Sequence, residues 1–154
     1  NNEIQNGWDD WGYQDNKTKA QISMIYGWYQ NIFNELIPSV LTEFDSSRPY
    51  WPTSPLYGYG HNESYIVGDN HYYAVWVLNA SFDNYTLYVG RFMSEYGIQG
   101  LLCMNSIKKY TLPEDRDLNS TVILAHEKGP AAYDHIGVYL DCYYKPIQGF
   151  ENYV

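Results

Sequence analysis

One short segment, which ends in a glutamate and is interrupted by a glycine, constrains the fold of this 154-residue chain more than any other stretch. Residues 90–97 are Gly-Arg-Phe-Met-Ser-Glu-Tyr-Gly, so Glu95 closes a largely apolar segment and Gly97 interrupts it. A buried strand presents an acid at the rim of a sheet or barrel in this way. We therefore expect a strand that delivers Glu95 to one end of a sheet.

A second candidate acid stands near the start of the sequence. Residues 1–4 are Asn-Asn-Glu-Ile, in which two amides precede Glu3 at the edge of an apolar residue. Glu3 and Glu95 lie 92 positions apart, which leaves room for roughly three strand-plus-helix units between them. Two acids brought together from distant strands indicate a glycosidase. For each acid, a helix-capping or solvent-exposed glutamate is the alternative.

The charge and the aromatic content of the chain limit the classes of molecule that it can bind. The chain has 18 acidic and 9 basic residues and a net charge of −9, which argues against nucleic acid and against an anionic membrane surface. Its 18 Tyr, 5 Trp and 5 Phe make up 18% of the residues. Aromatic side chains with a polar end suit wet clefts in which their faces stack on sugars, and a Tyr-rich core is the alternative explanation.

Cysteine content and hydropathy exclude several other classes. Cys103 and Cys142 are too few for a disulfide framework, and no Cys/His spacing is typical of zinc sites. We therefore expect neither a structural metal nor a cofactor. The apolar runs are too short to span a bilayer. By analogy with other sugar-degrading proteins of such folds, the expected location is secreted or periplasmic.

Periodicity predicts helices separated by extended runs. Apolar residues at helical spacing predict a helix that starts near Asp15 or Asn16 and ends near Pro38, with a short second helix over residues 38–44. Further helices are expected over residues 99–110 and 131–144. The members of the first apolar face are Ile22, Ile25, Tyr29, Ile32, Phe33 and Leu36.

A strand is predicted over residues 69–78, where His71, Tyr73 and Val75 share one face of an extended chain. Strands that alternate with helices indicate a parallel α/β sheet or barrel, with residues 1–154 in one domain. A complete (β/α)8 TIM barrel needs about 250 residues. We therefore interpret residues 1–154 as the C-terminal half of such a barrel.

Several motifs together resemble the β-mannosidases of glycoside hydrolase family two. Their order and spacing are also similar to those of that family's catalytic barrel, and the resemblance extends over nearly the whole chain. The motifs occupy residues 1–4, 7–8, 11–12, 48–50, 54–55, 68–72, 75–76, 91–92 and 94–97, with a similar tail at 115–118, 126–128 and 150–154.

The resemblance implies a partial catalytic barrel that runs from the end of strand 4 through strand 7 and the following helices. It places Glu3 at the end of the fourth strand as general acid/base and Glu95 at the end of the seventh as nucleophile. It further implies a retaining double displacement, for which two carboxyl groups stand about 5 to 5.5 Å apart.

The resemblance also suggests residues that contact substrate or orient the acids. Asn2 is expected to hydrogen-bond the sugar's 2-hydroxyl, and Trp11 to contact the mannose. Tyr73 is expected to orient the nucleophile, with Tyr72 in its place if the register slips by one residue. His71 receives an orienting role only, and Trp51 is a candidate wall of the cleft.

The prediction is a β-mannosidase that removes terminal non-reducing β-D-mannose from β-mannosides. The alternatives are a β-galactosidase or β-glucuronidase on the same barrel, and an inactive homologue that only binds carbohydrate. We expect the remainder of a parent chain to be needed to complete the barrel, and a homo-oligomer is compatible with this prediction.

Overall fold

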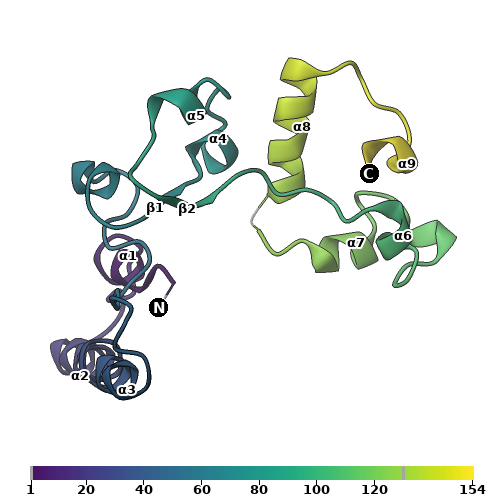
Figure 1. Ribbon diagram of the computed structural model, residues 1–154. Coiled ribbons are helices and arrows are strands. Elements are labelled where there is room, and N and C mark those ends of the chain that lie inside the picture. Colours follow the sequence, from purple (N-terminus) through teal and green to yellow (C-terminus); the bar gives the residue numbers. More distant parts are fainter. Residues whose placement is uncertain (1, 130) are drawn as a thin grey trace. The chain divides into compact units, whose positions relative to one another are not determined.

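A computed structural model describes residues 2–129 and 131–154 (Figure 1). Asn1, which belongs to the Asn-Asn-Glu-Ile motif, lies outside the described residues. The described residues form two compact units: one comprises residues 2–72 and 85–96, and the other comprises residues 73–84 and those from 97 onward. Both candidate acids, Glu3 and Glu95, belong to the first unit.

The first unit has the helical run predicted between residues 15 and 44, with different boundaries, and one helix that was not predicted. The unpredicted helix α1 spans Ile4–Asp9, and α2 spans Lys19–Gln30. The predicted caps Asp15 and Asn16 are wrong, because Thr18 caps α2: its hydroxyl accepts the Gln21 N–H at 3.3 Å, and the Gln21 side chain accepts the Thr18 N–H at 2.9 Å. This reciprocal capping box satisfies two backbone donors at the helix start.

The predicted helix end at Pro38 is wrong as well. After α2 the chain continues through a π-helical segment, Asn31–Leu36, into α3, Ile37–Phe44, in which Pro38 lies in the first turn. A proline ring collides with the carbonyl four residues earlier in a regular helix, and it has no N–H to donate. The wider π turn relieves that collision, so the helical run passes through the proline.

Two short parallel strands carry the site. Strand β1 is Asn70–Tyr72 and β2 is Met93–Tyr96, with His71 opposite Glu95 and Tyr72 opposite Tyr96. A separate parallel bridge joins Asn2 to Ser54. Among the described residues β1 and β2 are the paired strands, and the half-barrel assignment stays a prediction.

The predicted strand over residues 69–78 is wrong in its second half. Tyr73 leaves the extended conformation (φ −117°, ψ 13°), and helix α4, Ala74–Val77, begins directly after it. The Trp76 and Val77 N–H groups donate to the Tyr73 carbonyl at 2.9 and 2.6 Å. A continuous apolar run is compatible with a buried strand or a buried helix, so its hydropathy did not distinguish the two.

Tyrosines pack around the far face of β1. The Tyr72 side chain is 1% exposed, and its ring centroid lies 5.8 Å from those of Tyr59 and Tyr88 and 6.3 Å from that of Tyr85. Because successive strand residues point to opposite faces, Tyr72 points away from the face of His71. This position does not suit the fallback role at the nucleophile.

Burial, with a smaller contribution from neighbouring tyrosines, raises the pKa of Tyr72 to about 12. As pH rises from about 10 towards 12, the unfolded chain ionises this phenol and the folded chain does not, so the free energy of unfolding falls. Below that window both states hold the proton and the contribution is intact.

Tyr72→Phe is therefore expected to flatten the alkaline loss of stability. Urea unfolding of the full-length gene product between pH 9 and 12 should show the variant gaining on the wild type as pH rises. Tyr144→Phe, at an exposed position, is the matched control and should parallel the wild type. Parallel curves for Tyr72→Phe would contradict the assigned burial of this phenol.

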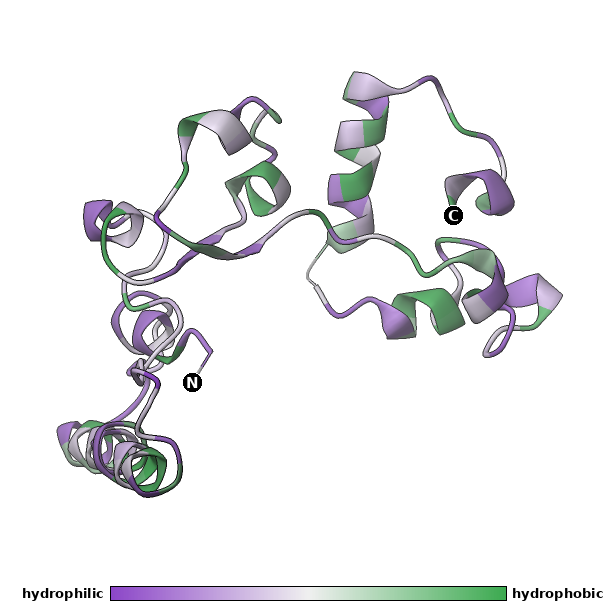
Figure 2. Ribbon diagram, in the orientation of Figure 1, coloured by the Kyte–Doolittle hydropathy of each residue, from purple (hydrophilic) through white to green (hydrophobic). Residues whose placement is uncertain are grey.

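Helices dominate the second unit. After α4 come α6 (Met104–Ile107), α7 (Thr121–His126), α8 (Ala132–Tyr143) and α9 (Phe150–Tyr153), and α5 (Asn84–Leu87) leads back into the first unit. The helix predicted over residues 99–110 is confined to α6, whereas the one predicted over 131–144 is confirmed as α8. In Figure 2, α8 carries both hydrophobic and hydrophilic residues, as expected for a helix that packs on one face only.

Aromatic side chains near α4 and α8 pack against one another in the second unit. The Trp76 and His135 rings are 5.4 Å apart, and Phe82 stacks on Tyr139 at 5.1 Å. Tyr139 also donates its hydroxyl to the Ala80 carbonyl at 2.8 Å. Within the described part of the chain, no helix combines the length and apolar character that crossing a membrane requires.

Candidate active site

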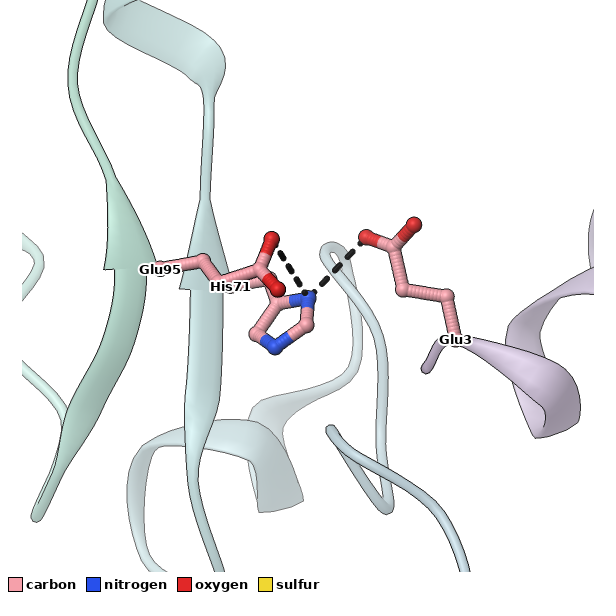
Figure 3. Close-up of side chains that lie close together, drawn as sticks. All are labelled: Glu3, His71 and Glu95. Carbon is pink, nitrogen blue, oxygen red and sulfur yellow. Dashed lines mark hydrogen bonds and ion pairs between the residues drawn. The ribbon is translucent and has the colours of Figure 1, made fainter. Parts of the chain in front are cut away.

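Glu3, His71 and Glu95 converge on one point in the first unit (Figure 3). The His71 Nδ1 atom lies 3.0 Å from Glu3 Oε1 and 3.5 Å from Glu95 Oε2. One oxygen of each carboxylate and this nitrogen all lie within 4.8 Å of one another. The His71 side chain is 4% exposed, against 24% for Glu3 and 38% for Glu95. A buried imidazole therefore stands beside two partly accessible carboxylates.

The backbone explains how the two acids meet. Glu95 lies opposite His71 in the parallel register, and paired residues of neighbouring strands project to the same face. Glu3 follows the Asn2–Ser54 bridge, and its N–H donates to the Ser54 carbonyl at 2.7 Å. Its backbone is left-handed (φ 50°), a conformation that is uncommon for a residue with a Cβ and recurs at functional sites.

The far side of the imidazole meets a second group of polar side chains. The Nε2 atom lies 3.4 Å from Ser54 Oγ and 3.7 Å from Asp69 Oδ2. Ser54 and Ser94 both donate their hydroxyls to Asp69 Oδ2. Sequence analysis gave these three residues no role. The available signal was spacing, because Asp69 stands two residues before His71 and Ser94 directly before Glu95.

The other residues predicted to contact substrate or to orient the acids differ in their exposure and in the unit to which they belong. The Asn2 side chain is exposed, while its backbone pairs with Ser54. Trp11 is 53% exposed and Trp51 is 40% exposed, so each offers ring surface to solvent. Tyr73 is half-buried and belongs to the second unit, as the residue before α4. The roles proposed for these side chains stay predictions.

Two kinds of chemistry fit the Glu3–His71–Glu95 cluster. Each residue offers one ligand atom at a spacing that suits a metal ion. Two carboxyl groups at this separation also suit acid and nucleophile roles at one sugar ring. In the structure the His71 nitrogen already faces the Glu3 oxygen at hydrogen-bonding distance. The sequence-based expectation of no metal stays a prediction.

Comparison with known proteins gives one consistent result. A curated Beta-mannosidase B from Thermothelomyces thermophilus is 33% identical over 116 residues, which are 71% of this chain and 13% of the relative. One from Aspergillus oryzae is 30% identical over 127 residues, or 80% of this chain and 15% of the relative. No protein-family model matches.

A solved structure agrees in fold. The crystal structure of Beta-D-Mannosidase from Dictyoglomus thermophilum matches 99% of this chain and 18% of its own, with a TM-score of 0.76 and 29% sequence identity. The chain resembles a segment of the β-mannosidases. It spans less than a fifth of the length of each of these β-mannosidases. The similarity therefore covers a segment of a glycoside-hydrolase fold and not a whole enzyme.

Proposed function

We propose that residues 1–154 form part of the catalytic barrel of a retaining β-mannosidase, with Glu3 as general acid/base and Glu95 as nucleophile. The observation that carries this proposal is the approach of the two carboxylates to within 4.8 Å beside His71. Retaining glycosidases hold their carboxyl groups about 5 to 5.5 Å apart, whereas inverting ones leave about 6.5 to 9.5 Å for a water molecule.

The reaction proceeds in two displacements. Glu95 attacks the anomeric carbon, the glycosidic carbon–oxygen bond breaks, and Glu3 gives its proton to the departing oxygen. The resulting mannosyl ester on Glu95 is then attacked by water, whose proton passes to Glu3 as the ester bond breaks. Glu3 must therefore carry a proton, and Glu95 a negative charge, when the substrate binds.

The proposal also includes substrate contacts. We propose that Asn2 meets the axial 2-hydroxyl of mannose, and that Trp11 and Trp51 offer ring faces to the sugar. In the same scheme His71 orients both acids from their buried side. The substrate class is β-D-mannosides with a terminal non-reducing mannose.

Stereochemistry tests the proposal. Proton NMR of the full-length gene product acting on 4-nitrophenyl β-D-mannoside should show β-mannose as the first product, ahead of mutarotation. α-Mannose first would contradict the retaining mechanism. Turnover of a β-galactoside or β-glucuronide in place of the mannoside would favour those activities, and binding without turnover would favour a carbohydrate-binding homologue.

Residues 1–154 expressed alone are expected to be inactive and either insoluble or molten. The β-mannosidases they resemble are several times longer, and within the described residues β1 and β2 pair only with each other, which leaves sheet edges uncovered. Phe44, Leu87 and Phe92 are also 77%, 69% and 66% exposed. Gel filtration and thermal melting check this, and a monodisperse monomer with a cooperative melt would contradict it.

A further inference from the structure

Asp69 connects the segments that carry both candidate acids. It accepts a hydroxyl hydrogen bond from Ser54, whose carbonyl accepts the N–H of Glu3. It accepts another from Ser94, the residue before Glu95 in β2. The Asp69 side chain is 12% exposed, so solvent competes little for these bonds.

The same carboxylate faces the buried histidine. The Asp69 Oδ2 atom is 3.7 Å from His71 Nε2, on the opposite side of the ring from the two glutamates. A buried imidazole takes its orientation from the partner of its second nitrogen. The hydrogen-bond partner of Nε2 is the Ser54 hydroxyl at 3.4 Å, and Asp69 accepts a hydrogen bond from that hydroxyl, so Asp69 helps to set where Nδ1 stands between Glu3 and Glu95.

We propose that Asp69 is a positioning residue for the pair Glu3 and Glu95, acting through His71 and the hydroxyls of Ser54 and Ser94. The inference rests on the proposed function and extends it to a residue that does not touch substrate. Loss of the Asp69 carboxylate removes an acceptor shared by the Ser54 and Ser94 hydroxyls and a neighbour of the imidazole, so the segments that carry Glu3 and Glu95 lose the group that connects them.

The dependence of the rate loss on the leaving group distinguishes a positioning role of Asp69 from a simple loss of protein stability. A 2,4-dinitrophenolate departs without a proton, whereas a sugar or alkyl alcohol needs one from Glu3. In the step that forms the mannosyl ester, displacement of Glu95 slows both kinds of substrate, and displacement of Glu3 further slows only the second kind. Loss of folded protein scales both rates by the same factor.

The experiment compares Asp69→Asn with the wild type in the full-length gene product, with exposed Asp141→Asn on α8 as the matched control. We expect kcat/KM, which reports formation of the mannosyl ester, to fall about 10- to 100-fold on 2,4-dinitrophenyl β-mannoside, the scale of a small misplacement of reacting groups. On β-mannobiose the fall in kcat/KM should be larger. The control should match the wild type.

Ser94→Ala, which removes one of the two serine hydrogen bonds to Asp69, should show the same ranking of substrates with a smaller loss. It decides the question if Asp69→Asn does not fold. Equal losses on both substrates, or no loss, would overturn the positioning role while leaving the proposed function intact. A wild-type protein that turns over neither mannoside would overturn the proposed function and this inference together.

Discussion

Replacing Glu95 by alanine in the full-length gene product is expected to lower kcat on aryl β-mannosides by at least about 10⁴-fold, the scale seen when an enzyme loses its nucleophile. No mannosyl ester can form without this carboxylate. The substitution also leaves a space opposite the anomeric carbon that a small anion can enter. Added azide should therefore restore turnover and yield α-mannosyl azide, because a single displacement inverts the configuration.

Glu43→Ala is the matched control for this experiment, since Glu43 is exposed on α3. It should keep wild-type rates and give no azide product. If Glu95→Ala retained activity close to that of the wild type, the assignment of the nucleophile would be wrong. Rescue that gave β-mannosyl azide would instead assign Glu95 the acid/base role.

Glu3→Ala is expected to separate the two displacements. Without the proton donor, β-mannobiose hydrolysis should fall by about 10²- to 10⁴-fold, whereas mannosylation by 2,4-dinitrophenyl β-mannoside should persist because its leaving group needs no proton. Water then attacks the ester slowly for want of a base, so a pre-steady-state burst of dinitrophenolate should appear in stopped-flow absorbance.

Azide gives this variant a distinct signature. It attacks the ester on Glu95 from the face that Glu3 occupied, so the expected product is β-mannosyl azide, the opposite anomer to that of Glu95→Ala. Equal losses on both substrates, with neither burst nor azide product, would show that Glu3 does not act as the acid/base.

Sequence alone predicted the parts of the site that depend on short local signals. The Ser-Glu-Tyr-Gly ending predicted Glu95 at a strand end, and it stands in β2 beside His71. The helix over residues 131–144 was recovered as α8 because its apolar residues recur at helical spacing over a dozen positions. The β-mannosidase interpretation came from the order of several motifs, since each is weak alone.

Features that depend on tertiary contacts were missed. The apolar residues after Tyr73 suited a strand as well as the helix they form, and packing in the second unit decides between the two. Pro38 indicated a helix end, but the π-helical segment before it lets the helix continue through the proline. Asp69 is an ordinary acid in the sequence. Its importance appears only when Ser54 and Ser94, 40 positions apart, reach the same oxygen.

The central claim is that Glu95 forms the covalent bond to the sugar while Glu3 stands across from it. Its most direct test is to treat the full-length gene product with 2-deoxy-2-fluoro-β-D-mannosyl fluoride and locate the adduct by peptide mass spectrometry. The proposed mechanism predicts one fluoromannosyl group on Glu95. An adduct on Glu3, Asp69 or any other carboxylate would contradict it, as would turnover of the mannoside without inactivation by this reagent.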